Sequence, residues 1–120
     1  MNIVALIAAL SAFIIGSIPF GVLVGKHFGA DPRKAGSRNI GATNVARLLG
    51  WKCGITVLVL DVAKGAIATW IGLEFGQSWG LIAGFCATIG HCYSPWLGGA
   101  GGKGVATALG VLLVADPTSA

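Results

Sequence analysis

The first 25 residues of the chain, Met1–Gly25, contain no charged side chain, and this stretch constrains the fold more than any other feature. An α-helix rises about 1.5 Å per residue, so a helix of this length exceeds the ~30 Å hydrocarbon core of a bilayer. The stretch has no basic start, and it is longer than the apolar core of about 7–15 residues in a secretory signal peptide. It therefore predicts a membrane span that the mature chain retains.

Three more apolar blocks follow, at Cys53–Leu73, Trp79–Leu97 and Gly104–Ala115. Charged residues make up only 10% of the chain, whereas soluble domains carry roughly 25%. We therefore expect an all-α fold, a polytopic membrane helix bundle with about four apolar segments, in a single integral-membrane domain over residues 1–120. The last block is unusual, because a helix of its length rises only about 18 Å and is too short to cross the bilayer.

Glycine and proline predict details of helix packing. Gly21 and Gly25 form one GxxxG pair, and Gly80 and Gly84 form another. Such pairs let two helices approach closely, so we expect helix–helix contacts at both. Pro19 predicts a kink in the first span.

Basic residues predict the orientation in the membrane. The loop Lys26–Lys52 holds six of the eight lysines and arginines. Because cytoplasmic loops carry an excess of basic residues, we expect this loop in the cytoplasm and the N-terminus outside. Counting spans, the glycine-rich loop before the last block then faces the cytoplasm as well.

That glycine-rich loop, Gly98–Gly104, is almost bare backbone around Lys103 and precedes a short helix from Val105. Free N–H groups at a helix start, together with a lysine, suit an anion such as phosphate. Thr107 lies one turn further on. The alternative is a plain turn in which Lys103 only marks the cytoplasmic side.

A second polar cluster lies in the basic loop. It offers hydroxyl, amide and guanidinium groups within eleven residues, a set that suits a small polyol phosphate. We expect Thr43 or Asn44 to cap a short helix that Gly50 ends. The alternative is a solvated loop that only sets topology. The candidate binding residues are Ser37, Asn39, Thr43, Asn44 and Arg47.

Two charged residues, Asp61 and Lys64, lie inside the second apolar block. Each mid-membrane charge costs about 2.5–3.5 kcal/mol on insertion scales, and residues three apart share a helix face. A functional pair and a structural pair both remain open. His91 is a general base, a hydrogen-bonded structural residue or an anion contact.

Cysteine and histidine spacing predicts no metal site. The three cysteines, Cys53, Cys86 and Cys92, have no CxxC spacing, and only His27 and His91 accompany them.

Together these segments resemble the bacterial integral-membrane acyltransferases that transfer a fatty acyl chain from acyl-phosphate to glycerol 3-phosphate. The resemblance rests on GSRNIGATN (Gly36–Asn44) with Arg47, on DVAKG (Asp61–Gly65) and on GHCYSPWLGGAGGKGVAT (Gly90–Thr107). It implies formation of lysophosphatidic acid for phospholipid synthesis, with no metal or organic cofactor. The implied partners are acyl-phosphate, glycerol 3-phosphate and the lipid bilayer, with no nucleic acid. The implied location is the cell inner membrane, multi-pass, with the active face in the cytoplasm.

The resemblance also implies roles for particular residues. Lys103 and His91 would be catalytic, and the cluster from Ser37 to Arg47 would bind glycerol 3-phosphate. Because the sequence shows no clear protein base, we expect the substrate's own phosphate to assist in removing the hydroxyl proton, with His91 as the competing base. The residues implied for the phosphate loop are Gly101, Gly102, Lys103, Gly104 and Thr107.

Length leaves two alternatives. Chains of this family are longer and carry a third cytoplasmic motif near the C-terminus, so we expect these 120 residues to be the N-terminal portion of the family fold. One alternative is therefore an inactive fragment of the enzyme. The other is a small non-catalytic membrane protein that binds anionic lipid.

Overall fold

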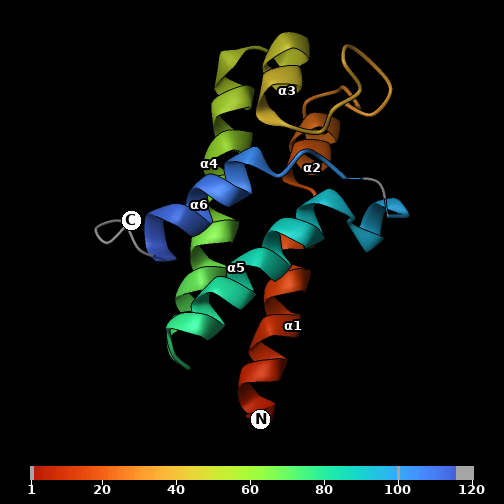
Figure 1. The fold of residues 1–120 in the computed structure, drawn as a ribbon. Helices are drawn as coiled ribbons and strands as arrows, with labels where there is room; N and C mark the ends of the chain where they lie inside the picture. Colours follow the sequence, from red (N-terminus) through yellow and green to blue (C-terminus); the bar gives the residue numbers. More distant parts are fainter. Residues whose placement is uncertain (1, 100, 116–120) are drawn as a thin grey trace.

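The computed structural model describes residues 2–99 and 101–115, and within these ranges every regular element is a helix. This confirms the expected all-α fold. Figure 1 shows the arrangement. The elements are α1 (Ile3–Ser17), α2 (Phe20–His27), α3 (Ala42–Leu49), α4 (Trp51–Leu73), α5 (Gln77–Cys92), the 3₁₀ turn η1 (Pro95–Leu97) and α6 (Val105–Ala115).

The first span is broken into α1 and α2 instead of being kinked. Ile18 is extended, with φ −61° and ψ 117°, and Pro19 follows it at φ −87°. Proline has no N–H to continue the helix, and it keeps the preceding residue out of the α region. At the break, the carbonyl of Ile18 accepts a hydrogen bond from the N–H of Phe20 at 3.0 Å instead of from the next helical turn, and its second lone pair can accept one from another helix.

Within the part of the chain that the structure describes, two stretches are long and apolar enough to cross a membrane, Ile3–His27 with 25 residues and Trp51–Leu73 with 23. The expected third span, Trp79–Leu97, is helical only to Cys92, where α5 ends. The helix α6 has 11 residues and is as short as the sequence predicted. Large apolar side chains on the outer faces are exposed, among them Phe85 and Leu112 at 67% each.

Small residues bring the helix backbones together. A Cβ at Gly16 would overlap the backbone of Ala87, and one at Gly110 would overlap that of Val62. These close approaches seat α1 against α5 and α6 against α4. The core between α1, α4 and α5 accordingly consists of alanines.

The two GxxxG pairs behave differently. Gly80 and Gly84 lie against side chains of α4 and α6, which confirms the expected helix packing. The same expectation is wrong for Gly21 and Gly25. Both face loop backbone and not another helix, Gly21 against Ile40 and Gly25 against Ala30. A GxxxG pair specifies close approach but not its partner.

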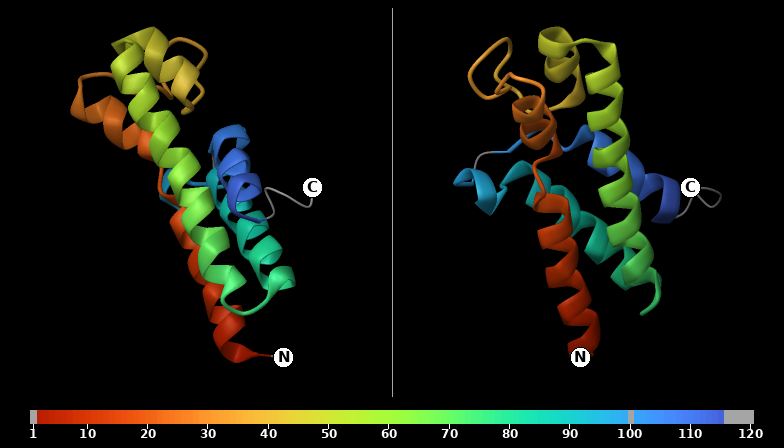
Figure 2. Two further views of the ribbon diagram at one scale, coloured as in Figure 1. Left: turned by 90° about the vertical axis from the view of Figure 1, so that its left-hand side faces the viewer. Right: turned by 180° about the vertical axis from the view of Figure 1, so that it is seen from behind.

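The loop between α2 and α3 and the helix α3 lie at one end of α4, and the N-terminus of the chain lies at the other (Figures 1 and 2). In the glycine-rich loop, Gly98 and Gly99 follow η1, and residues 101–104 lead into α6. The helix α3 begins after Gly41, so the expectation that Thr43 or Asn44 caps it is wrong. Gly50 ends it with φ 98°, as predicted.

Candidate functional site

A cavity of about 470 Å³ opens between the basic loop, α4, the end of α5 and the start of α6. It joins the two polar segments that the sequence singled out, which are separated by more than fifty residues along the chain. Leu58, Val105 and Leu109 form an apolar wall. The expected site residues that line the cavity are Ser37, Asn39, Thr43, Asn44, Arg47, His91, Lys103 and Gly104.

The start of α6 forms one side of this cavity. Gly104 precedes the helix with φ 80°, a left-handed conformation that favours glycine. Lys103, Gly104, Val105 and Ala106 all line the cavity. Because the first N–H groups of a helix are unpaired and electropositive, this side of the cavity favours an anion.

The glycines before Lys103 allow the loop to lie directly on α5. The N–H of Gly102 donates to the carbonyl of His91 at 3.2 Å. A Cβ at Gly101 would overlap that same carbonyl oxygen, and a Cβ at Gly102 would lie 2.5 Å from His91 Nε2. Gly101 and Gly102 therefore position the loop, and they are not among the residues that line the cavity.

Thr107 does not line the cavity. Its side chain is fully buried, and its backbone lies against Gly65 of α4. Among the residues that the structure describes, its hydroxyl has no hydrogen-bond partner. The close packing of α6 on α4 turns this residue away from the place that the resemblance implied.

Asn44 is buried, and its amide organises the basic loop. Its Oδ1 accepts a hydrogen bond from the N–H of Ser37 at 3.0 Å. Its Nδ2 lies 3.0, 3.1 and 2.9 Å from the carbonyl oxygens of Pro32, Ala35 and Asn39. Both the oxygen and the nitrogen of this amide are therefore hydrogen-bonded to the backbone of the loop.

Replacing Asn44 by aspartate is expected to unfold the loop locally. A carboxylate would face three carbonyl oxygens, and a buried polar group that loses its partner costs about 1–3 kcal/mol. Limited trypsin digestion should then cut faster after Arg33, Lys34 or Arg38. The control is Thr43→Val on the same helix, an exposed position. Equal cleavage of Asn44→Asp and the unmodified protein would contradict the role of this amide.

One ion pair stabilises the same loop outside the cavity. Arg33 donates to Asp31 through Nε at 3.0 Å and Nη2 at 2.8 Å. These hydrogen bonds hold the pKa of the Asp31 carboxyl at about 2, below its usual value. Neither side chain lines the cavity.

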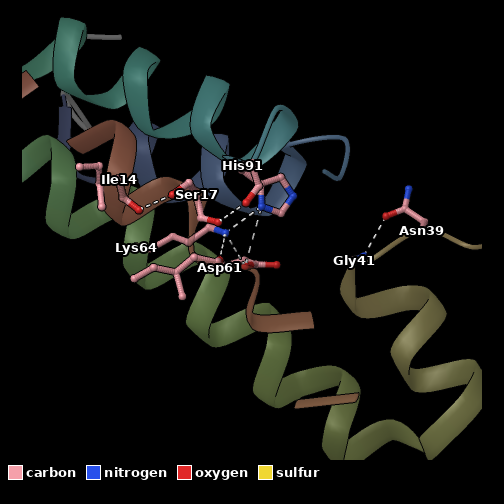
Figure 3. Close-up of polar contacts among 9 residues, drawn as sticks. Ile14, Ser17, Asn39, Gly41, Asp61, Lys64 and His91 are labelled. Carbon is pink, nitrogen blue, oxygen red and sulfur yellow. Dashed lines mark hydrogen bonds and ion pairs between the residues drawn. The ribbon is translucent and has the colours of Figure 1, made fainter. Parts of the chain in front are cut away.

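Three charged or polar side chains form a buried group, drawn in Figure 3, and two of them line the cavity. Lys64 Nζ lies 3.0 Å from Asp61 Oδ1 and 2.8 Å from His91 Nδ1. It also donates to the carbonyl of Ile18 at 2.9 Å, at the break between α1 and α2. Asp61, Lys64 and His91 are exposed by only 1%, 3% and 5%.

The sequence predicted the contact between Asp61 and Lys64. It did not predict the contacts of Lys64 with His91 and with the carbonyl of Ile18. The spacing of three residues in one helix is local, whereas His91 and Ile18 come from other elements. Pro19 was the available signal, because a proline keeps the residue before it out of the α region and so turns the carbonyl of Ile18 away from the helix. Asp61 and His91 line the cavity, and Lys64 lies behind them.

A polar cavity that favours an anion lies between apolar helices. This arrangement is that of an integral membrane protein with a buried polar site. The chain belongs to the glycerol-3-phosphate acyltransferase family, whose sequence pattern matches residues 6–120. This family assignment confirms the resemblance that the motifs indicated and places the chain in a membrane.

Relatives and solved structures agree with this assignment. The chain is 54% identical over 116 residues to a glycerol-3-phosphate acyltransferase of Leptospira borgpetersenii serovar Hardjo-bovis, covering 92% of this chain and 53% of the relative. It is 50% identical over 113 residues to one of Thermus thermophilus, covering 92% of this chain and 57% of that relative.

The fold is similar to the crystal structure of PlsY (YgiH), an integral membrane glycerol 3-phosphate acyltransferase, in its glycerol 3-phosphate form. The TM-score is 0.89 at 44% sequence identity, covering 94% of this chain and 58% of that chain. The lysophosphatidic acid form of PlsY gives a TM-score of 0.87 at 43% identity, covering 94% and 57%. The chain spans about half the length of the curated relatives it matches.

Proposed function

We propose that the protein transfers a fatty acyl group from acyl-phosphate to glycerol 3-phosphate and so forms lysophosphatidic acid. The observation that carries the proposal is the cavity itself, because it joins Lys103 and the start of α6 to the polar cluster around Arg47. The relatives' names and the glycerol 3-phosphate form of PlsY support glycerol 3-phosphate as the acceptor.

The two polar sides of the cavity suit two anions. Glycerol 3-phosphate would bind on the side of the basic loop. The guanidinium of Arg47 suits its phosphate. The hydroxyls of Ser37 and Thr43 and the amide of Asn39 suit its hydroxyl groups. Lys103 and the N–H groups that open α6 would hold the phosphate of the donor. Asn44 would act through the loop that it organises, and the apolar wall would receive the acyl chain.

The reaction needs no covalent enzyme intermediate, metal or organic cofactor, because acyl-phosphate is an activated mixed anhydride. The glycerol hydroxyl attacks the acyl carbonyl carbon, the bond from that carbon to the phosphate oxygen breaks, and phosphate leaves. The departing phosphate takes the hydroxyl proton. Lys103 stabilises the negative charge on that phosphate, and the cavity aligns the two substrates.

The proposed location is the cell inner membrane, in several passes, with the N-terminus outside and the active face in the cytoplasm. The basic loop Lys26–Lys52 supports this orientation through the positive-inside rule. Its end of the molecule lies opposite the N-terminus (Figure 2).

Lys103→Ala is expected to lower acyl transfer about 10²-fold, the size of effect that follows loss of one transition-state donor. The assay uses membranes that contain the full-length protein encoded by its gene, acyl-phosphate and labelled glycerol 3-phosphate, with product measured as lysophosphatidic acid. Lys34→Ala is the matched control, because that exposed lysine does not line the cavity.

Three outcomes would contradict the proposal. Unchanged turnover by Lys103→Ala would remove the lysine from the site. Transfer from acyl-CoA in place of acyl-phosphate would overturn the assigned donor. Membranes that enrich anionic lipid but show no transfer would favour the non-catalytic alternative.

A further inference from the structure

We propose that His91 donates a hydrogen bond through Nε2–H to a phosphate oxygen in the cavity and that it is not a general base. Lys64, held by Asp61, is the positioning residue that sets the proton on Nε2. The inference rests on the proposed function, because it assigns a role within the same site.

The contact between Lys64 and His91 sets the tautomer of the imidazole. An ammonium has three donors and no acceptor. Its Nζ lies 2.8 Å from His91 Nδ1, so that nitrogen has to offer a lone pair. A neutral imidazole that accepts at Nδ1 carries its proton on Nε2. The distance from His91 Nδ1 to Asp61 Oδ1 is 4.0 Å, too long for a competing hydrogen bond.

The surroundings of Lys64 keep it in the ammonium form. Asp61 supplies the counter-charge at 3.0 Å, and the carbonyl of Ile18 accepts at 2.9 Å. The ring of Phe20 lies 5.7 Å from Nζ and adds a cation–π contact. A doubly protonated imidazole would bring a second N–H against this ammonium, and the like charges would repel.

The other ring nitrogen faces the glycine-rich loop. A Cβ added at Gly102 would lie 2.5 Å from His91 Nε2. His91 and Lys103 both line the cavity. The N–H of Gly102 meanwhile donates to the carbonyl of His91. The backbone of His91 thus binds the loop while its ring lies against Gly102, and the Nε2–H is the group left to meet an anionic oxygen.

A donor and a base differ in their response to substitution. His91→Gln places an amide N–H near the position of Nε2 but cannot act as a base. His91→Asn keeps an acceptor for Lys64, but its shorter side chain places no hydrogen-bond donor at the position of Nε2. In the full-length protein in membranes, we expect His91→Asn and His91→Ala to lose about 10²-fold in turnover. We expect His91→Gln to stay within about tenfold of the unmodified protein, since it retains the donor. A general base would make all three variants equally poor, and that result would overturn the proposal.

The phosphate can come from either substrate, and the Michaelis constants separate the two. A rise in KM for acyl-phosphate in His91→Asn would show that the Nε2–H of His91 binds the departing phosphate. A rise in KM for glycerol 3-phosphate would show that the Nε2–H of His91 binds the phosphate of that substrate. A variant that loses turnover through misfolding alone would also fall below the unmodified protein in thermal stability, whereas a donor role predicts that His91→Asn unfolds at an unchanged temperature.

A readout without turnover tests the tautomer itself. The protein is labelled with ¹⁵N-histidine, and the His91 signals are assigned by their loss in His91→Gln. We expect the proton on Nε2 in the unmodified protein and a mixture of tautomers in Lys64→Met. A proton on Nδ1 in the unmodified protein would overturn the inference, even where acyl transfer is normal. Absence of acyl transfer with the proton on Nε2 would instead count against the proposed function.

Discussion

Lys64→Met is expected to lower the free energy of unfolding by about 3–5 kcal/mol, because breaking a buried ion pair leaves an uncompensated charge. Asp61 is 1% exposed and would lose its counter-ion. His91 Nδ1 would lose its donor in the same step, and the carbonyl of Ile18 would keep only the N–H of Phe20. Thermal unfolding of the purified protein in detergent, at fixed lipid content, measures the change.

Two companion variants make this result interpretable. Lys52→Met removes an exposed lysine from the first turn of the same helix, and surface substitutions of that kind stay within about 0.5 kcal/mol. The double variant Asp61→Leu with Lys64→Met removes both charges and should recover a large part of the loss. A single Lys64→Met that unfolds like the unmodified protein would show that the pair contributes nothing.

Gly101→Val is expected to reduce acyl transfer by about 10³-fold or more. Its Cβ would overlap the carbonyl oxygen of His91, so the loop would have to leave the end of α5. Lys103 and the N–H groups that open α6 would then move together. A misplacement of about 1 Å alone costs about 10²-fold, and loss of a transition-state donor adds a similar factor.

Gly99→Ala is the matched control in the same loop. Gly99 has φ 89° and nothing within 4 Å of an added Cβ. Alanine there meets only the strain of a left-handed backbone, about 1–2 kcal/mol, without any collision. We expect its transfer rate to stay close to that of the unmodified protein. Equal loss in the two variants would mean that general loop strain, and not contact with His91, controls the site.

Several features of the site were predictable because they depend on neighbouring residues in the chain. Proline predicted that the first span is irregular at Pro19, although as a kink and not as a break. Glycine predicted the end of α3 at Gly50, and the i,i+3 spacing predicted the contact between Asp61 and Lys64. The glycine-rich loop before α6 was also visible as a candidate anion site. Each of these follows from the conformational limits or spacing of a few residues.

Other features depended on where distant elements meet. The amide of Asn44 has the same donors and acceptors whether it binds a substrate or a loop. Only the path of residues 32–39 around it shows that the loop takes both ends. The hydroxyl of Thr107 has the spacing of a phosphate contact, but the rotation of α6 on α4 turns it inward.

The amino-acid sequence by itself determined that this protein is an α-helical membrane protein of the acyltransferase family. Hydropathy, charge placement and the ordered motifs are properties of the chain alone, so they needed no coordinates. The tertiary structure decided which polar groups face the cavity and which bind elsewhere in the protein. Glycine contacts such as Gly72 of α4 against the backbone of Trp79 and Gly80 of α5 set how the helices rotate and approach. That close packing, which sequence spacing does not encode, brings Lys64 to His91 and turns a candidate base into a hydrogen-bond donor.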